Sequence, residues 1–352
     1  MRTQDCPIIA LMKFSLFSTQ RLRSTGTASL AALCWLAYLH ATCVAAQANA
    51  LPPAQPGHAS ASDITLHIAV AANFTATLQK LLDAYARSAP TAANSVISSA
   101  STGTLFHQIV HGAPFDVFFA ANEVHPRELL ARGLGVQGSL LNYAQGQLVL
   151  LHKKNNRRNG DDIALQFTTD ACKRNANANN NADALSAILQ SARQVIIANP
   201  LTAPYGSVSK QLIEQLKKVK PIKRDSIVPG NTATKKIPEL LIARNVMHAQ
   251  QLFASSAADA AFISLPQFQA NPQAGRKQSW LACHVNTALH KPILQFAIAL
   301  ANANRPREYR SQSVALLAFA NSNQGRRIIA QHGYVLAPTT PNSANKAANN
   351  VE

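Results

Sequence analysis

Short apolar runs alternate with helical patterns along most of the chain from residue 64 onward. The first run, 68–72, is small and apolar, as in a strand covered on both faces. The segment 75–87 then places four apolar side chains on one helical face: Leu78, Leu81, Leu82 and Tyr85. Asn73 therefore lies where the carboxyl end of a strand meets the amino end of a helix. Ligands bind at such junctions in open α/β sheets, although the position equally suits a plain helix cap.

The same unit of strand, polar corner and helix recurs along the chain. The apolar runs predict further strands at 95–99, 116–121, 147–151, 194–198, 259–264 and 292–301. The helical patterns predict helices at 104–111, 125–132, 184–192, from 207 onward, from 244 to about 256, and at 311–331. This alternation favours parallel α/β sheets. Two such runs, with the chain returning at its end, indicate two lobes that open and close about crossing strands.

The amino-terminal segment 1–50 reads as a signal peptide. Arg21 and Arg23 precede an apolar run, and two A-x-A cleavage patterns end at Ala48 and Ala50. Met12 is an alternative start of translation. We therefore expect export to the periplasm.

The remaining boundaries follow from composition. Residues 51–62 are predicted to be a disordered leader and 338–352 a disordered tail. Residues 152–183 are basic and rich in asparagine, which predicts a solvated loop. We expect a first lobe built from 63–144 and 292–337, and a second lobe from 145–291.

Charge and cysteine content narrow the class of protein. The chain is 47% hydrophobic, enough for real cores, and carries a formal net charge of +17. The basic residues gather in the loops 152–183 and 217–224 without interleaved aromatics, which argues against nucleic-acid binding; contact of these loops with lipid or a transporter is a hypothesis. After cleavage, Cys172 and Cys283 are the remaining cysteines. The sequence leaves open whether they pair, because nothing sets the distance between them.

Four polar corners carry the candidate chemistry: Asn73, Ser101-Thr102, Tyr205-Gly206 and Asn245-Val246. They offer amide, hydroxyl and backbone N–H donors, and none pairs a carboxylate with a histidine or a nucleophile. Neutral donors at helix amino ends are suited to a small anion. A protonated oxyanion would leave its own O–H unpaired there, at a cost of about 1–3 kcal/mol. The corners therefore predict a site for a fully ionised tetrahedral anion.

Five motifs, in this order, resemble the periplasmic molybdate-binding proteins of ABC transporters. They are Ala71-Ala72-Asn73-Phe74, Ser101-Thr102-Gly103, the Gly-Ala-Pro-x-Asp-Val-Phe stretch at 112–118, the corner from Asn199-Pro200 to Pro204-Tyr205-Gly206, and Gly333-Tyr334-Val335-Leu336. Each match is short, but their order and spacing from about Ile64 to Pro338 make the resemblance specific.

The resemblance implies a two-lobed periplasmic binding protein of the second class, each lobe a mixed, mostly parallel sheet flanked by helices. It implies that Asn73 and Thr102 bind oxyanion oxygens by side chain and backbone N–H, assisted by Ser101 or Ala72. Tyr205 and Val246 would donate backbone N–H groups from the second lobe. The segment 231–233 competes with Val246, which we prefer because it lies at the family's distance from 258–262.

The same resemblance implies what accompanies the site. The ligand would be molybdate or tungstate, with no catalytic residue, no cofactor and no metal other than the molybdenum of the bound anion. The partner would be the permease of an ABC importer in the inner membrane, and the receptor would be a monomer.

Three alternatives remain open at this stage. The fold also serves sulfate and phosphate receptors. A transferase that assembles the linear tetrapyrrole shares it, but it needs a cysteine-attached cofactor and cleft arginines, which the surroundings of Cys283 do not supply. A metal receptor would use His107, His111 and His125, yet no Glu or Cys joins them at useful spacing, and we take these histidines as surface residues.

Overall fold

The computed structural model describes residues 64–88, 94–153, 170–174, 176–217, 238–270 and 280–338. All of them belong to one compact unit, Ala59–Glu352. Six predicted features lie outside the described residues, wholly or in large part: the signal peptide, the leader at 51–62, the loop 152–183 (of which 154–169 and 175 are not described), the basic run at 217–224, the competing segment 231–233 and the tail. Within the described ranges, no helix is long and apolar enough to cross a membrane.

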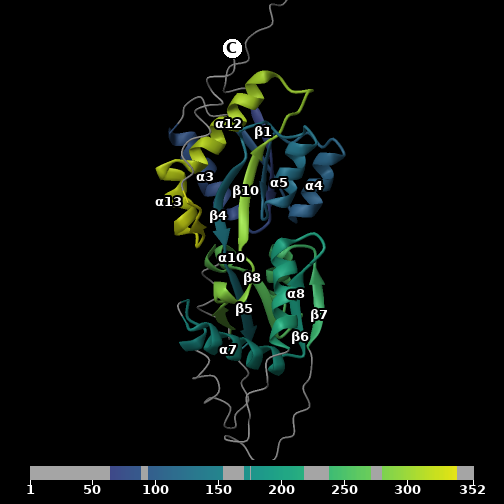
Figure 1. The fold of residues 1–352 in the computed structure, drawn as a ribbon, viewed down its shortest axis with the longest axis vertical. Coiled ribbons are helices and arrows are strands. Elements are labelled where there is room, and N and C mark those ends of the chain that lie inside the picture. The colour runs from purple at the N-terminus through teal and green to yellow at the C-terminus, as the bar shows by residue number, and fades with distance from the viewer. Residues whose placement is uncertain are drawn as a thin grey trace, which may run out of the picture. The chain divides into compact units, whose positions relative to one another are not determined.

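The first sheet is covered by helices on both faces. Its strands, in the order β11-β4-β10-β3-β1-β2, are β1 (Thr65–Ala71), β2 (Asn94–Ala100), β3 (Val117–Ala120), β4 (Leu141–Gly146), β10 (Ile293–Ala299) and β11 (Val335–Leu336). Its helices are α3 (Thr75–Ser88), α4 (Thr102–Val110), α5 (Val124–Ala131), α12 (Arg307–Asn321) and α13 (Asn323–Gln331). Figure 1 shows α3, α12 and α13 on one side of the sheet and α4 and α5 on the other. The residues of β1 from Ile68 to Ala71 are accordingly at most 1% exposed, as predicted for a strand covered on both faces.

The second sheet is built in the same way. Its strands, in the order β7-β6-β8-β5-β9, are β5 (Leu148–Lys153), β6 (Gln194–Ala198), β7 (Glu239–Ala243), β8 (Ala260–Ser264) and β9 (Trp280–His284). Its helical segments are α7 (Ala178–Ser191), α8 (Pro204–Leu216), α9 (Val246–Ala254), α10 (Leu265–Ala270) and the short 3₁₀ turn η3 (Thr287–Leu289). Alternate residues of β5 enter two different cores: Leu148 and Leu150 pack with α7 and α8, whereas Val149 and Leu151 pack with α9.

The chain passes between the two sheets twice, as predicted for a two-lobed fold. It leaves the first sheet after Gly146, enters the second at Leu148, and returns between β9 and β10. The change of sheet lies at Gln147, slightly beyond the predicted boundary after residue 144, because Gln145 still pairs with β10 and β11. The sheets are mixed, as predicted, but they are not mostly parallel. Four strand pairs are parallel: β1–β2, β1–β3, β6–β7 and β6–β8. Five are antiparallel: β3–β10, β4–β10, β4–β11, β5–β8 and β5–β9. The two strands that enter a sheet from the other lobe, β5 and β10, run opposite to the parallel strands of that sheet.

Two secondary-structure predictions need correction. The predicted helix 311–331 is two helices, α12 and α13, which break at Ser322. Ser322 has an extended backbone (φ −67°, ψ 164°), and its hydroxyl accepts a hydrogen bond from the Gly325 N–H at 3.2 Å. Ser322 therefore caps a new helix, as serine commonly does.

The predicted loop 152–183 is partly regular structure. His152 and Lys153 belong to β5, and α7 begins at Ala178 after the cap Asn177. Asn181 is fully buried; its amide donates to the carbonyls of Ala171 (2.7 Å) and His284 (2.8 Å). Composition suggested a solvated segment, but buried asparagine that is fully hydrogen-bonded is stable in a core.

A disulfide between Cys172 and Cys283 answers the question that the sequence left open. The two Cα atoms are 4.3 Å apart, and 111 positions separate the residues in the chain. Cys283 lies on β9, so the bond ties the segment before α7 to the edge strand of the second sheet.

Candidate functional site

The four predicted corners lie at the carboxyl ends of strands, two in each lobe. In the first lobe the Ala72 N–H donates to the Ala100 carbonyl at 2.9 Å, which joins the corner after β1 to the corner after β2. In the second lobe the Asn199 N–H donates to the Ala243 carbonyl at 2.7 Å and joins the corners after β6 and β7. Parallel strands that are neighbours place their carboxyl ends at one edge of the sheet. Each lobe therefore presents a pair of adjacent corners.

The two pairs meet where the lobes touch. The Gly103 N–H, in the first turn of α4, donates to the Thr202 carbonyl, just before α8, at 2.8 Å. One continuous apolar cluster contains Ala72 and Ala121 of the first lobe together with Tyr205 and Val246 of the second. All six predicted ligand residues are buried, and none is more than 4% exposed: Ala72, Asn73, Ser101, Thr102, Tyr205 and Val246. The structure thus brings the predicted residues to one boundary between the lobes.

The Asn73 side chain is engaged inside the first lobe. Its amide nitrogen donates to Gln295 Oε1 at 2.8 Å and to the Tyr334 hydroxyl at 3.0 Å, and the Tyr334 O–H donates to the Asn73 carbonyl at 2.8 Å. Both amide hydrogens are used within the protein, so the predicted side-chain contact to an oxyanion is not available in this arrangement. The backbone N–H of Asn73 has no partner among the described residues. The side chain holds the turn, and the backbone offers the donor.

Thr102 offers two donors at the second corner. Its Oγ1 accepts a hydrogen bond from the Ala121 N–H at 3.0 Å, which leaves the hydroxyl hydrogen without an acceptor within the described chain. Thr102 is also the first residue of α4, and its N–H has no partner among those residues. Ser101 is the cap of this helix: its hydroxyl is 2.7 Å from Thr104 Oγ1 and accepts from the Thr104 N–H at 3.4 Å. The Ser101 side chain therefore caps this helix.

The second lobe contributes two helix amino ends. Tyr205 and Gly206 follow Pro204 in the first turn of α8. The cap residue Ala203 has no polar side chain that could accept a hydrogen bond from their N–H groups. Val246 is the first residue of α9, and its cap Asn245 accepts from the His248 N–H at 2.9 Å, not from Val246. The N–H groups of Tyr205, Gly206 and Val246 have no partners in the part of the chain that the structure describes. Free N–H groups at a helix amino end carry the positive end of the helix dipole.

In the described part of the chain, the boundary between the lobes holds no buried cation. Among the described residues, no lysine or arginine is buried, and Arg244, beside the fourth corner, is exposed. Burial raises the pKa of the phenols of Tyr143, Tyr205 and Tyr334, so all three stay protonated. Any anion held here would be bound by neutral donors.

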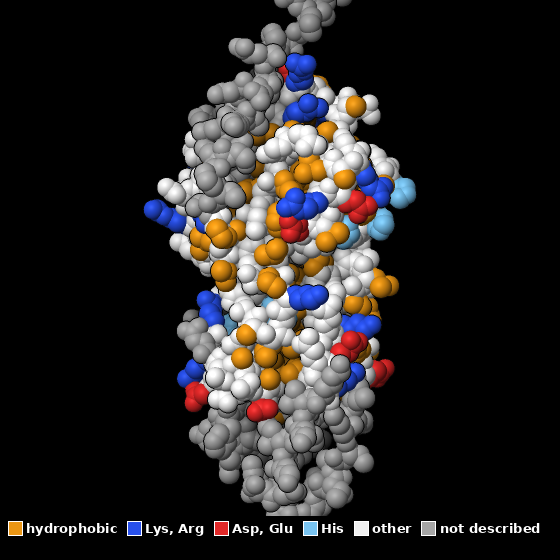
Figure 2. Space-filling model, in the orientation of Figure 1, with side chains coloured by type: hydrophobic (Ala, Val, Ile, Leu, Met, Phe, Trp, Pro, Cys, Tyr) orange, Lys and Arg blue, Asp and Glu red, His pale blue; other side chains and the backbone are white. Residues whose placement is uncertain are grey.

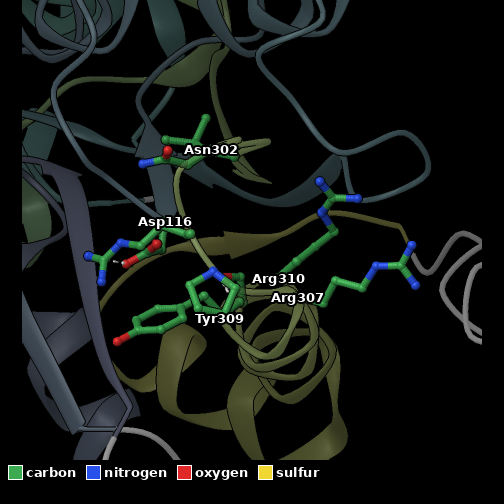
Figure 3. Close-up of a pocket in the computed structure, with 9 residues that line it drawn as sticks. Asp116, Asn302, Arg307, Tyr309 and Arg310 are labelled. Atoms are coloured by element: carbon green, nitrogen blue, oxygen red, sulfur yellow. Dashed lines mark hydrogen bonds and ion pairs between the residues drawn. The ribbon is translucent and has the colours of Figure 1, made fainter. Parts of the chain in front are cut away.

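A hollow elsewhere in the first lobe is held by its own ion pair (Figure 3). Asp116 accepts from the His67 N–H at 2.7 Å and from Arg305 at 3.2 Å, while Arg307 and Arg310 point away from it. Asp116 directly precedes β3, so the hollow lies at the opposite end of that strand from the corners. Burial raises the pKa of Asp116 although its partners lower it. The buried charge is already compensated, and the hollow is structural.

The metal and transferase alternatives find no support at their key residues. His107 and His111 are exposed, and His125 packs on Phe106 with ring centroids 4.6 Å apart and contacts Asn122. Among the residues described, no group of three metal-binding side chains occurs. Cys283 is bonded to Cys172, so it offers no free thiol to a cofactor.

Residues that sequence reasoning missed lie behind the corners. Gln295 is fully buried on β10, at the point where the pairing with β4 shifts register, and it holds Asn73. Gly146 lies against Tyr205, and Gly206 adds a further N–H. Gly206 and Tyr334 stood in quoted motifs, but no local pattern indicates which distant residue a buried Gln or Gly will meet.

The fold and the donor set define a solute-binding protein. A family model described as bacterial extracellular solute-binding protein matches residues 66–335, and the chain belongs to this family. It is 28% identical over 271 residues to the molybdate-binding protein ModA of Azotobacter vinelandii, covering 77% of this chain and 90% of the relative. It is 26% identical over 267 residues to ModA of Rhodobacter capsulatus, covering 76% and 86%.

A solved structure agrees with these relatives. The periplasmic molybdate-binding protein of Azotobacter vinelandii superposes with a TM-score of 0.55 at 27% identity, covering 77% of this chain and 99% of that one. The predicted resemblance and the predicted two-lobed fold are both confirmed.

Proposed function

We propose that this chain is the substrate-binding protein of an ABC importer that captures molybdate, and also tungstate, in the periplasm. One observation carries the proposal: unpartnered neutral donors from Asn73, Thr102, Tyr205 and Val246 lie at adjoining corners of both lobes, with no buried cation among the described residues. The relatives support molybdate as the anion, since two that are 28% and 26% identical to this chain are named for molybdate.

The donor set fits a tetrahedral dianion. Backbone N–H groups of Asn73, Thr102, Tyr205 and Val246, together with the Thr102 hydroxyl, supply enough donors for four oxygens. Helix amino ends supply the compensating field, so no lysine or arginine is required. A protonated oxyanion would place its own O–H against donors only and leave it unpaired. The site would therefore prefer an anion that is fully ionised at neutral pH.

Capture would proceed by closure of the lobes about the crossing strands. Each lobe supplies donors, so the anion is fully surrounded only when both lobes meet. The closed form would then dock on the permease in the inner membrane. We propose no catalytic step and no cofactor, and a monomeric receptor exported by the signal peptide predicted at 1–50.

The basic residues do not change this assignment. On the face drawn in Figure 2, lysine and arginine side chains are spread over the surface with acidic ones among them. Among the described residues of that face, no single basic field points to a nucleic acid or a lipid surface.

Calorimetric titration of the protein from about residue 51 tests the proposal. We expect tight binding of molybdate and tungstate, and weak or absent binding of sulfate and phosphate. Binding of sulfate or phosphate alone would support a site of neutral donors for a tetrahedral anion but would show that the substrate is not molybdate. Absence of heat with all four anions, in protein shown to be folded by circular dichroism, would refute the proposed function.

A substitution at Thr102 tests the hydroxyl donor separately. We expect Thr102→Ala to weaken molybdate binding about 10- to 150-fold, because a hydrogen bond to a charged group contributes about 1.5–3 kcal/mol. Thr102→Ser keeps the hydroxyl and is the matched control, with affinity expected within about threefold of wild type. Equal affinities in the alanine and serine variants would show that the hydroxyl does not contact the anion.

A further inference from the structure

The side chain of Tyr205 reaches the strands on which the lobes turn. A Cβ atom placed on Gly146 would collide with the Tyr205 hydroxyl oxygen and lie 2.9 Å from the ring carbon that bears it. Such contacts are far shorter than van der Waals distance. The phenol thus occupies the space that any side chain at position 146 would need, and glycine, which has no Cβ, fits there.

Gly146 stands at the crossing between the lobes. It is the last residue of β4, it pairs with Ile293 at the start of β10, and Gln147 follows it between the two sheets. The same Cβ position lies 3.0 Å from Gln295 Nε2, and Gln295 Oε1 accepts the hydrogen bond from Asn73. One small cluster therefore joins both crossing strands, the residue that holds the first corner, and the side chain of a second-lobe donor.

The Tyr205 phenol contacts Gly146 by steric packing and not through a hydrogen bond. Its hydroxyl is buried and has no hydrogen-bond partner among the described residues. Tyr205 is 2% exposed, so the ring cannot turn towards solvent without disturbing the residues packed around it. Displacing the ring would displace its backbone, and Tyr205 is the second residue of α8, whose first turn carries the free N–H groups. Close-packed interiors transmit such a displacement instead of absorbing it.

We propose that the Tyr205 phenol, seated in the space left by Gly146, locks the amino end of α8 against the crossing strands and so positions the second-lobe donors relative to Asn73. Gly146 and Gln295 are positioning residues, which act on the anion through Tyr205 and Asn73. This inference rests on the proposed function for its ligand, molybdate, and adds a device that couples the hinge to the site.

A double-mutant cycle tests the lock, with Gly146→Ala made in wild type and in Tyr205→Phe. In wild type we expect the substitution to lower molybdate affinity at least about tenfold, since overpacking of a buried site is costly. In the Tyr205→Phe background the hydroxyl contact is gone and the 2.9 Å contact with the ring carbon remains, so we expect a loss at least about threefold smaller than in wild type. The thermal midpoint without anion is expected to show the same pattern, with a drop of several degrees in wild type and about half of it in the Phe background.

Tyr143→Phe is the matched control for the second background. Tyr143 also lies on β4 and carries a buried hydroxyl without a partner among the described residues. The Tyr143→Phe substitution should not restore the molybdate affinity lost in Gly146→Ala, because the Tyr143 hydroxyl is not among the three atoms nearest to the Gly146 Cβ position.

The outcomes separate the lock from the proposed function. Equal effects of Gly146→Ala in wild type, Tyr205→Phe and Tyr143→Phe would overturn the lock. A Tyr205→Phe substitution that reduces the effect of Gly146→Ala on the thermal midpoint but not its effect on molybdate affinity would also overturn it. Failure of the wild-type protein to bind molybdate would refute the proposed function instead, and the unfolding cycle would still decide whether the phenol is seated against Gly146.

Discussion

Val246→Pro should weaken molybdate binding about 10- to 150-fold while leaving α9 folded. Proline has no N–H, so the substitution deletes the proposed donor, and a hydrogen bond to a charged group contributes about 1.5–3 kcal/mol. Val246 is the first residue of its helix, where proline is well tolerated. Its N–H has no partner among the described residues, so no hydrogen bond between them is lost. Asn245, the preceding residue, has the extended backbone (φ −155°, ψ 178°) that precedes proline.

Val246→Ala is the control for this substitution. It removes apolar groups from a side chain that is 4% exposed but keeps the N–H. We expect it to lower stability by about 1–2 kcal/mol and to leave molybdate affinity within about threefold of wild type. Calorimetric titration of the two variants, with urea unfolding as the check of fold, makes the comparison. Wild-type affinity in the proline variant would remove Val246 from the site and return the segment 231–233 as the candidate.

Removal of the disulfide should cause the largest loss of stability. The bond closes a loop of 111 positions between Cys172 and Cys283. In the chain-entropy model a loop of this length contributes about 4–5 kcal/mol, because the cross-link restricts the unfolded chain. We expect Cys172→Ala/Cys283→Ala, and equally the reduced wild-type protein, to unfold at clearly lower urea concentration than the oxidised protein.

Urea unfolding with and without reductant measures this effect. The double variant is its own control, since reductant should not change its transition. In the protein from residue 51, Cys172 and Cys283 are the only cysteines, so no other thiol complicates the comparison. A wild-type transition that does not respond to reductant under denaturing conditions would show that the bond is absent from the purified protein.

Local chemistry along the chain was enough to place the corners. The apolar period of β1, the helical face of α3 and the polar residues between them depend on neighbours within a few positions, and the structure has each where the pattern predicts it. The same holds for β6, which spans 194–198 as predicted. The asparagine-rich composition of 152–183 predicted a solvated loop, but Asn181 in this segment is buried. Composition cannot predict this burial, because it depends on hydrogen-bond partners that lie elsewhere in the chain.

The sequence by itself determined the family, most of the alternating strands and helices, and the residues at four strand-to-helix corners, but it did not predict β4, β7, β9 and β11. Only the tertiary structure decided what those residues are free to do. The amide of Asn73 is used by Gln295 and Tyr334, which lie 222 and 261 positions away. Gly146 makes room for Tyr205, and Cys172 meets Cys283, through strand registers that no local pattern contains. Helix periodicity and capping are properties of neighbouring residues, whereas these contacts arise only when the sheets have set which distant segments lie side by side.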